Sequence, residues 1–231
     1  MGRGFESPMW LMIRRTLILI CFFFQFILSW AQNPDIKNDK NWDFEIVPIT
    51  HNSTIFKRIE GKSYAKGCNF PLEQLRYLKL LHYNAKGEVC RGEMICNKAI
   101  SKDLIEIFQE LFKMKYPIES MRLIDDFDAD DEKSMRANNT SAFIYRKVAG
   151  TKVLSYHSRG LAVDINPLYN PYIKGKLIQP ANAKAYTNRS GNFPYKITTQ
   201  DPCYKLFKKH GFTWGGSWRS LKDYQHFEKK L

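Results

Sequence analysis

The sequence predicts a single α+β domain with a central, mainly antiparallel sheet flanked by helices. Three observations predict this class. The chain of 231 residues is long enough for one well-packed domain and short for two. Hydrophobic residues make up 44% and charged residues 26%, which is typical of a globular protein and excludes wholesale disorder. Strand-like and helix-like stretches also follow one another without a repeat or an internal linker.

The N-terminal segment has the pattern of a secretory signal peptide. Three arginines, Arg3, Arg14 and Arg15, precede an apolar run over residues 17–28, and Ala31 follows it. A retained membrane anchor is the alternative, but the run is shorter than the roughly 20 residues that span a bilayer. We therefore expect cleavage after Ala31 and export across the cytoplasmic membrane, to the periplasm or the exterior.

The rest of the chain divides into a polar leader and the domain itself. Residues 32–66 show few strong patterns and are expected to form the leader, and residues 67–231 are expected to form the domain. The chain carries a net charge of +13. Without residues 1–31, which hold three arginines and one glutamate, the charge is (36−3) − (23−1) = +11. For an exported protein, this charge favours anionic envelope polymers over nucleic acid as a partner. Membrane contact is expected only through an uncleaved N-terminal segment.

Four cysteines follow the leader, and their pairing is open. Cys90 and Cys96 fall on one predicted strand, where six residues span about 20 Å, so they cannot bond to each other. One or two disulfides to Cys68 and Cys203 are therefore expected, and free buried thiols are the alternative.

The first half of the predicted domain contains a hairpin and a helix. Residues 75–84 and 89–97 have the alternation of paired strands. Ser101 is a candidate N-cap, and the apolar residues after it recur at helical spacing until Pro117 ends the helix. Residues 118–124 are predicted to form a strand.

An acidic run over residues 125–132 suggests a calcium-binding loop but does not match one. Such a loop needs glycine at its sixth position and glutamate at its twelfth. Counted from Asp126, those positions hold Asp131 and Ala137. A solvated turn or the start of a helix is the better interpretation.

The second half alternates short elements with a long loop. Residues 142–148 and 160–166 are predicted strands, and residues 167–200 are rich in Pro, Asn, Tyr and Gly without a clear period. Asp201 as N-cap and Gly211 just past the end then bracket a short helix.

Two segments carry candidate chemistry. In the first, S-Y-H-S-R-G-L-A-V-D, Gly160 allows a turn between His157 and a strand that carries Asp164. An unpaired carboxylate on an apolar strand is costly, so Asp164 needs a salt bridge or a metal shared with His157. In the second segment, W-G-G-S-W is followed by D-Y-Q-H-F-E, which places Asp223 three residues before His226. A structural hydrogen bond is the simpler explanation for either segment alone.

Taken together, the two segments resemble a known family. S-x-H-x-x-G-x-A-x-D, then W-G-G-x-W and D-x-x-H-F-E, is similar to the D-alanyl-D-alanine carboxypeptidase and L-alanyl-D-glutamate endopeptidase zinc peptidases, which include VanX-like and VanY-like enzymes and phage endolysins. The resemblance spans residues 118–228. It implies that the central sheet carries a zinc site.

The resemblance implies that His157, Asp164 and His226 bind one zinc ion. Two imidazoles and one carboxylate leave the fourth tetrahedral position to water, which is the arrangement of a catalytic zinc site. Asp223 matches the acidic position three residues before the last ligand and is implied as the base that takes a proton from water.

The resemblance also implies residues that bind the substrate. Ser155 matches a serine that would hydrogen-bond the substrate, and Arg146 is the best candidate for holding a carboxylate or an oxyanion. Arg122 and Arg136 are its rivals. Ser217 departs from the family pattern, in which relatives often carry aspartate.

The activity implied is hydrolysis of peptide bonds in peptidoglycan stem peptides. Whether the bond is a terminal D-Ala or an internal L-Ala–D-Glu bond stays open, although Asp at position 223 favours the endopeptidase branch. The main alternative is a non-catalytic zinc-containing module that binds the cell wall. Two further rivals are a cysteine peptidase that uses Cys203 with His226 or His210, and a serine hydrolase built from Ser155, His157 and Asp164. The sequence does not predict the oligomeric state.

Overall fold

The longest strands form an antiparallel sheet in the order β1–β2–β3. The strands are β1 (Glu45–Pro48), β2 (Leu75–Tyr83) and β3 (Val89–Asn97), so the predicted hairpin is confirmed. The structure, a computed structural model, describes residues 42–148 and 151–231.

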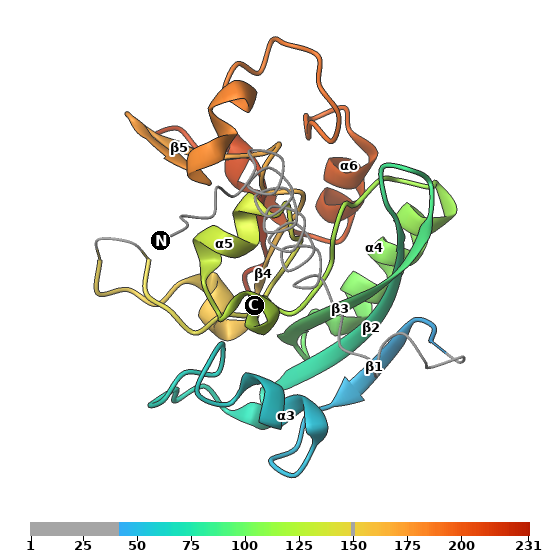
Figure 1. The fold of residues 1–231 in the computed structure, drawn as a ribbon, viewed down its shortest axis with the longest axis vertical. Helices are drawn as coiled ribbons and strands as arrows, with labels where there is room; N and C mark the ends of the chain where they lie inside the picture. The colour runs from blue at the N-terminus through green and yellow to red at the C-terminus, as the bar shows by residue number, and fades with distance from the viewer. Residues whose placement is uncertain (1–41, 149–150) are drawn as a thin grey trace, which may run out of the picture. The chain divides into compact units, whose positions relative to one another are not determined.

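Each face of this sheet packs on its own hydrophobic core because β2 alternates its side chains. Leu78 and Leu80 belong to one core, which α4 (Ser101–Lys113) completes. Tyr77 belongs to the other, which α3 (Thr54–Ile59) joins. In Figure 1, α4 lies along the β2–β3 hairpin.

The predicted helices are confirmed with small differences at their ends. The N-cap of α4 is Ile100, one residue before the predicted Ser101, whose hydroxyl donates to the carbonyl of Lys98. In α6 (Pro202–Lys209), the side chain of Asp201 accepts from the backbone N–H of Cys203, as its sequence predicts.

Two further sheets of three short strands follow. The first has the order β4–β9–β7, and the second has the order β6–β5–β8. All their pairs are antiparallel, so the predicted α+β class is confirmed, with the sheet divided into three. Their bounds are β4 Ala162–Asp164, β5 Tyr172–Lys174, β6 Leu177–Gln179, β7 Thr213–Trp214, β8 Lys222–Asp223 and β9 His226–Glu228.

The remaining elements are short. The acidic run starts a helix, α5 (Asp131–Arg136), whose N-cap Asp130 accepts from the N–H of Lys133. Single 3-10 turns connect the other parts: η2 Leu72–Gln74, η3 Ile124–Phe127, η4 Tyr156–Arg159, η5 Ala181–Tyr186 and η6 Gly215–Ser217.

Two predicted strands, residues 118–124 and 142–148, are wrong. Only isolated bridges occur there, because side chains take up the backbone groups that a strand partner would need. The amide of Asn139 binds both the N–H and the carbonyl of Arg122. In the second stretch, the N–H of Arg146 donates to the hydroxyl of Ser158.

The expected disulfides are also wrong, since Cys68, Cys90, Cys96 and Cys203 are all free. Cys96 and Cys203 are buried in the core between the sheet and the helices, where a thiol packs as a small hydrophobic group.

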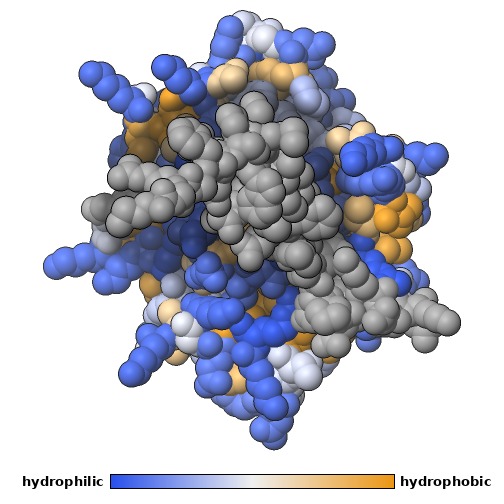
Figure 2. Space-filling model, in the orientation of Figure 1, coloured by the Kyte–Doolittle hydropathy of each residue, from blue (hydrophilic) through white to orange (hydrophobic). Residues whose placement is uncertain are grey.

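The N-terminal part differs from expectation where it is described. Residues 42–66 were assigned to a leader, yet they contain β1 and α3 and belong to the same unit as the rest, from Trp42 to Leu231. The predicted signal peptide, residues 1–31, lies outside the described residues. Within the described part, no helix is both long and apolar enough to cross a membrane. Figure 2 shows a face on which hydrophilic side chains surround small hydrophobic areas.

Candidate metal centre

Strand pairing brings together an aspartate and a histidine that are distant in the sequence. β4 and β9 are antiparallel, and their register sets Asp164 directly opposite His226. Both side chains are buried. The last residue of β4 and the first of β9 therefore share one position at the end of the pair.

His157 reaches the same position through a tight turn. It lies in η4, which ends at Gly160 with a φ of +64°, and the chain then enters β4. A Cβ added to Gly160 would lie 2.6 Å from the backbone nitrogen of Asn97. Both the left-handed backbone and this close approach require glycine, which explains the spacing from His157 to Asp164.

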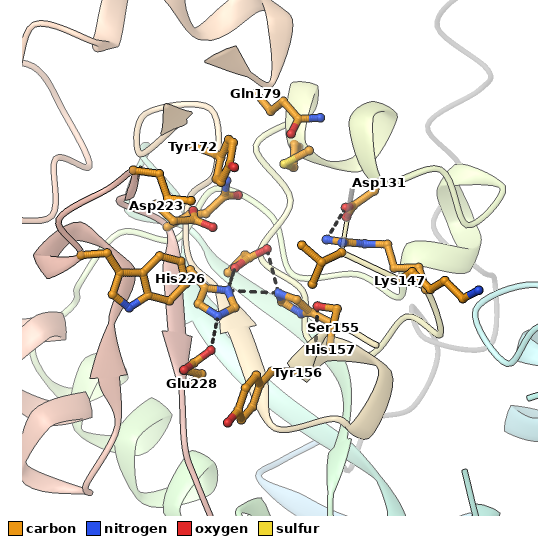
Figure 3. Close-up of a pocket in the computed structure, with 17 residues that line it drawn as sticks. Asp131, Lys147, Ser155, Tyr156, His157, Tyr172, Gln179, Asp223, His226 and Glu228 are labelled. Carbon is orange, nitrogen blue, oxygen red and sulfur yellow. Dashed lines mark hydrogen bonds and ion pairs between the residues drawn. The ribbon is translucent and has the colours of Figure 1, made fainter. Parts of the chain in front are cut away.

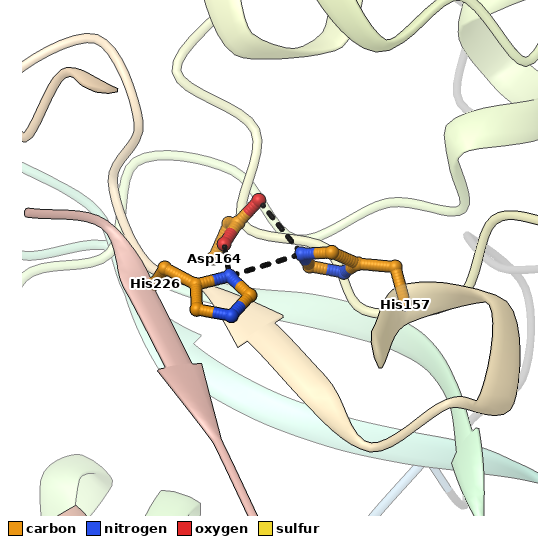
Figure 4. A group of neighbouring side chains, drawn as sticks. All are labelled: His157, Asp164 and His226. Atoms are coloured by element: carbon orange, nitrogen blue, oxygen red, sulfur yellow. Dashed lines mark hydrogen bonds and ion pairs between the residues drawn. The ribbon is translucent and has the colours of Figure 1, made fainter. Parts of the chain in front are cut away.

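The three side chains converge on one point, as Figure 4 shows. Nε2 of His157 lies 3.2 Å from Oδ2 of Asp164 and 3.2 Å from Nδ1 of His226. That Nδ1 lies 3.0 Å from Oδ1 of Asp164. All three possible ligand atoms fall within 4.8 Å of one another, so a single ion can reach all of them.

The outer nitrogens of both histidines have acceptor partners. Nδ1 of His157 donates to the carbonyl of Ala142, at 2.5 Å, and Nε2 of His226 lies 3.2 Å from Oε2 of Glu228. With a proton held on each outer nitrogen, the inner nitrogens can offer lone pairs to a metal. The donor set and its orientation therefore fit a metal ion of the kind that imidazole and carboxylate bind, such as zinc.

The charges in this group shift the pKa values of Asp164 and His226. Burial opposes a charged imidazole at His226, but its hydrogen bonds to Asp164 and Glu228 outweigh burial and raise its pKa to about 10. Burial likewise opposes ionisation of Asp164, yet His157 and His226 bring the pKa of this carboxyl well below its usual range. The point where the three side chains converge therefore favours a positive charge.

The group lies in the wall of a cavity of about 310 Å³. Figure 3 shows Asp223 and Tyr172 above His226, and Asp131 and Lys147 to the right of it. Oδ1 of Asp223 is buried without a hydrogen-bond partner. Burial raises the pKa of Asp223 to about 7, although the nearby His226 opposes this.

Asp223 is positioned by β8 and by the glycines of W-G-G. β8 pairs with β5, which sets Asp223 opposite Tyr172. A Cβ on Gly215 would lie 2.6 Å from the carbonyl oxygen of Asp223. Glycine at this position therefore lets the two segments touch.

Arg189, in the segment that follows η5, also holds this part of the chain. The guanidinium of Arg189 lies 4.3 Å from the ring centroid of Tyr224, the residue after Asp223. It also donates to the side-chain oxygen of Asn170 and to the carbonyl of Tyr169. The stretch predicted as a loop, residues 167–200, is thus tied to the cavity wall.

Ser155 lines the cavity and caps η4. Its hydroxyl accepts from the backbone N–H of His157, at 3.3 Å, rather than contacting the imidazole. This contact gives no support to a serine hydrolase built from Ser155, His157 and Asp164.

Of the three candidate arginines, Arg146 alone lines the cavity. One of its terminal nitrogens pairs with Asp131 at 2.7 Å, while its Nε is buried without a partner. Arg122 and Arg136 pair with acidic residues outside the cavity.

The two tryptophans of W-G-G-S-W have different positions. Trp214 is buried in the core, and its indole N–H donates to the carbonyl of Tyr224. Trp218 lines the cavity with its ring centroid 5.3 Å from that of His226. Ser217 is exposed and does not line the cavity.

Sequence reasoning missed several residues of the cavity. The alternation of β9 could have indicated Glu228, because it lies two positions after His226 and therefore on the same face. Tyr172 and Gln179 come from a stretch without a period, so no signal marked them. The unassigned lining residues include Asp131, Tyr172, Gln179, Gln225 and Glu228.

Cys203 does not support the cysteine-peptidase rival. It is fully buried in the core and is not a lining residue of this cavity. Burial raises the pKa of its thiol well above the usual value, which disfavours the reactive thiolate. His210 lies apart from it, with Nδ1 3.2 Å from a carboxylate oxygen of Asp103.

An α+β fold with a buried His-Asp-His group beside a carboxylate is the class of site found in hydrolases that use one metal ion. Comparison with protein families agrees with this class. Residues 149–229 match the model of a family described as D-alanyl-D-alanine carboxypeptidase. The match confirms the family resemblance over the segment that holds Ser155, His157, Asp164, Asp223 and His226. Comparisons with curated proteins and with solved structures found no match.

Proposed function

We propose that this protein is an exported, zinc-dependent peptidase that removes the terminal D-alanine from peptidoglycan stem peptides. The observation that carries the proposal is the convergence of His157, Asp164 and His226 beside Asp223 in one cavity. The family match over residues 149–229 supports a metallopeptidase, and its description supports the carboxypeptidase branch.

His157, Asp164 and His226 would hold the ion. When bound, zinc supplies a Lewis acid that activates water near neutral pH and polarises the scissile carbonyl. The outer hydrogen bonds to Ala142 and Glu228 keep both imidazoles turned toward the ion.

Asp223 would move the proton. Its raised pKa of about 7 suits a group that accepts a proton from water and then donates it to the leaving amine. Because Oδ1 is buried without a protein partner, that oxygen is free to bind water or substrate.

Arg146 and Ser155 would position the peptide. The partnerless Nε of Arg146 can donate to a carbonyl or carboxylate oxygen, while a terminal nitrogen of the same guanidinium pairs with Asp131. Ser155 adds a hydroxyl on the same wall.

Export to the cell envelope rests on the sequence of the N-terminal segment. The basic and apolar pattern of residues 1–31 supports a signal peptide, and the net charge of +13 suits an anionic wall polymer.

One experiment tests the proposal against its alternatives. The purified protein is incubated with zinc and two peptides, one ending in D-Ala-D-Ala and one with an internal L-Ala–D-Glu bond, and the products are read by mass spectrometry. Loss of one terminal D-alanine, abolished by a chelator, is the expected result. Cleavage of only the internal bond would assign the endopeptidase activity instead. Zinc binding without any cleavage would favour the non-catalytic wall-binding module.

A further inference from the structure

Unsatisfied polar atoms concentrate in the cavity. Among the described residues, five buried side-chain nitrogen or oxygen atoms lack a hydrogen-bond partner, and three of them belong to cavity residues. Two of these, Nε of Arg146 and Oδ1 of Asp223, already have proposed roles. The third, Oε1 of Gln225, has none.

The side chain of Gln225 is buried, and its backbone is hydrogen-bonded to a neighbouring segment of the chain. It is 2% exposed, so it cannot turn its amide to solvent. Its backbone carbonyl accepts from the N–H of Ile165 at 3.0 Å, which ties it to the chain just after β4. A buried carbonyl oxygen without a hydrogen-bond partner is energetically unfavourable. Such an atom in a cavity wall indicates a ligand that donates the missing hydrogen bond.

The chemistry of Gln225 limits what that ligand is. A side-chain hydrogen bond from Gln225 favours the ionised form of Asp223, and only the amide NH₂ of Gln225 can donate one. Oε1 can only accept a hydrogen bond. The ligand must therefore present an N–H or O–H donor to the cavity wall that Gln225 shares with Asp223 and His226.

We propose that Oε1 of Gln225 accepts a hydrogen bond from the N–H of the scissile peptide bond and so selects amide substrates over esters. This inference rests on the proposed peptidase function. During hydrolysis, water oxygen bonds to the acyl carbon and the C–N bond breaks. The nitrogen keeps the hydrogen that Gln225 holds and receives its second one from Asp223, which has taken it from water.

An ester of the same shape cannot make this contact. Its bridging oxygen replaces the N–H, so it would place an acceptor against Oε1 of Gln225 and leave both atoms unpaired. A site built to bind an N–H discriminates strongly against an analogue that lacks it, because the buried polar group stays unsatisfied.

The test compares the kcat/KM of an acetylated peptide ending in D-Ala-D-Ala with that of the matched ester, in which oxygen replaces the scissile N–H. Both values are corrected for uncatalysed hydrolysis and measured for the wild type and for Gln225→Met. We expect the amide-to-ester ratio to fall roughly tenfold or more in the variant, the worth of one such hydrogen bond. Loss of packing alone would lower both values together and leave the ratio unchanged.

A control accompanies this variant. Gln179→Met makes the same substitution on β6 in the same cavity and should keep the wild-type ratio. Zinc content and thermal unfolding are measured for each. If Gln225→Met does not fold, Gln225→Asn, which withdraws the carbonyl by one methylene, should show the same fall.

The outcomes separate the two proposals. If the wild type cleaves the amide and Gln225→Met has the same amide-to-ester ratio, the proposed role of Gln225 is wrong. The proposed peptidase function is not affected by that result. A zinc-loaded wild-type protein that cleaves neither substrate overturns the proposed function and this inference with it.

Discussion

At the scale of single residues, the site separates groups that would hold a metal from groups that would act on a substrate. The family resemblance of the two motifs taken together implied the roles of His157, Asp164, His226 and Asp223. Gln225 could not be predicted, since its significance lies in a missing hydrogen bond that only the folded arrangement reveals.

Replacing Asp223 should separate turnover from metal binding. Asp223→Asn keeps the shape of the side chain but cannot take a proton, so we expect kcat to fall by about 10²–10⁴-fold. Zinc content should stay at one ion per chain, because Asp223 is not among the three converging residues. An activity assay measures kcat, and metal analysis measures the zinc content. Loss of zinc in this variant would contradict the role of Asp223 as a base that does not bind the metal.

Glu228 should tune the affinity for zinc. It holds the outer nitrogen of His226, and loss of such a partner typically weakens metal binding by about 10–100-fold. Glu228→Gln should show this loss in a competition titration with a fluorescent chelator. Glu106→Gln, at an exposed carboxylate on α4, is the matched control and should bind zinc like the wild type.

Zinc binding should strengthen as the pH rises. The metal-free protein keeps His226 protonated up to a pKa of about 10, and zinc needs the neutral imidazole. The ion must therefore displace a proton below that pKa, and apparent affinity should rise by up to about tenfold per pH unit. Calorimetry in buffers of different ionisation enthalpy would count the released protons. Release of none between pH 6 and 8 would contradict the raised pKa.

At the scale of elements, periodicity predicted the long features and missed the short ones. The β2–β3 hairpin, α4 and α6 are long enough for their apolar spacing to be distinctive. Residues 118–124 and 142–148 have strand-like composition, but the side chains of Asn139 and Ser158 bind their backbone groups instead. Such contacts join residues that are far apart in the sequence, so a local sequence pattern does not predict them.

The turn at Gly160 should be essential for the site. Gly160→Ala combines an unfavourable φ with a contact of 2.6 Å to the backbone of Asn97, so we expect a loss of about 1–3 kcal/mol or more in the free energy of unfolding. Gly175→Ala is the matched control, since its φ is +58° but an added Cβ meets nothing within 4 Å. Urea unfolding compares them. Equal losses would show that the contact with Asn97 is unimportant.

At the scale of the whole molecule, the α+β class could be predicted and the arrangement of its sheets could not. Composition and alternation indicate strands and helices, but the pairing of β4 with β9 joins segments about 60 residues apart. The same limit explains why β1, in the supposed leader, was not expected to pair with β2.

Metal removal should destabilise the folded chain. An ion that binds only the folded state adds about 4 kcal/mol when its free concentration is a thousand times Kd. Chelation should therefore lower Tm, and added zinc should restore it. His226→Ala should show no such response, and a wild-type Tm that ignores zinc would contradict a site formed by the fold.

The proposed base lies on a different sheet from two of the three proposed ligands. Asp223 belongs to β8, which pairs with β5, whereas Asp164 and His226 lie on β4 and β9. Along the chain, Tyr224 and Gln225 alone separate β8 from β9. A small rotation of one sheet against the other would change the distance from the Asp223 carboxylate to the ion. The positions of the three ligands relative to one another would stay the same. How tightly the protein keeps its metal and how fast it works are thus separate adjustments in this architecture.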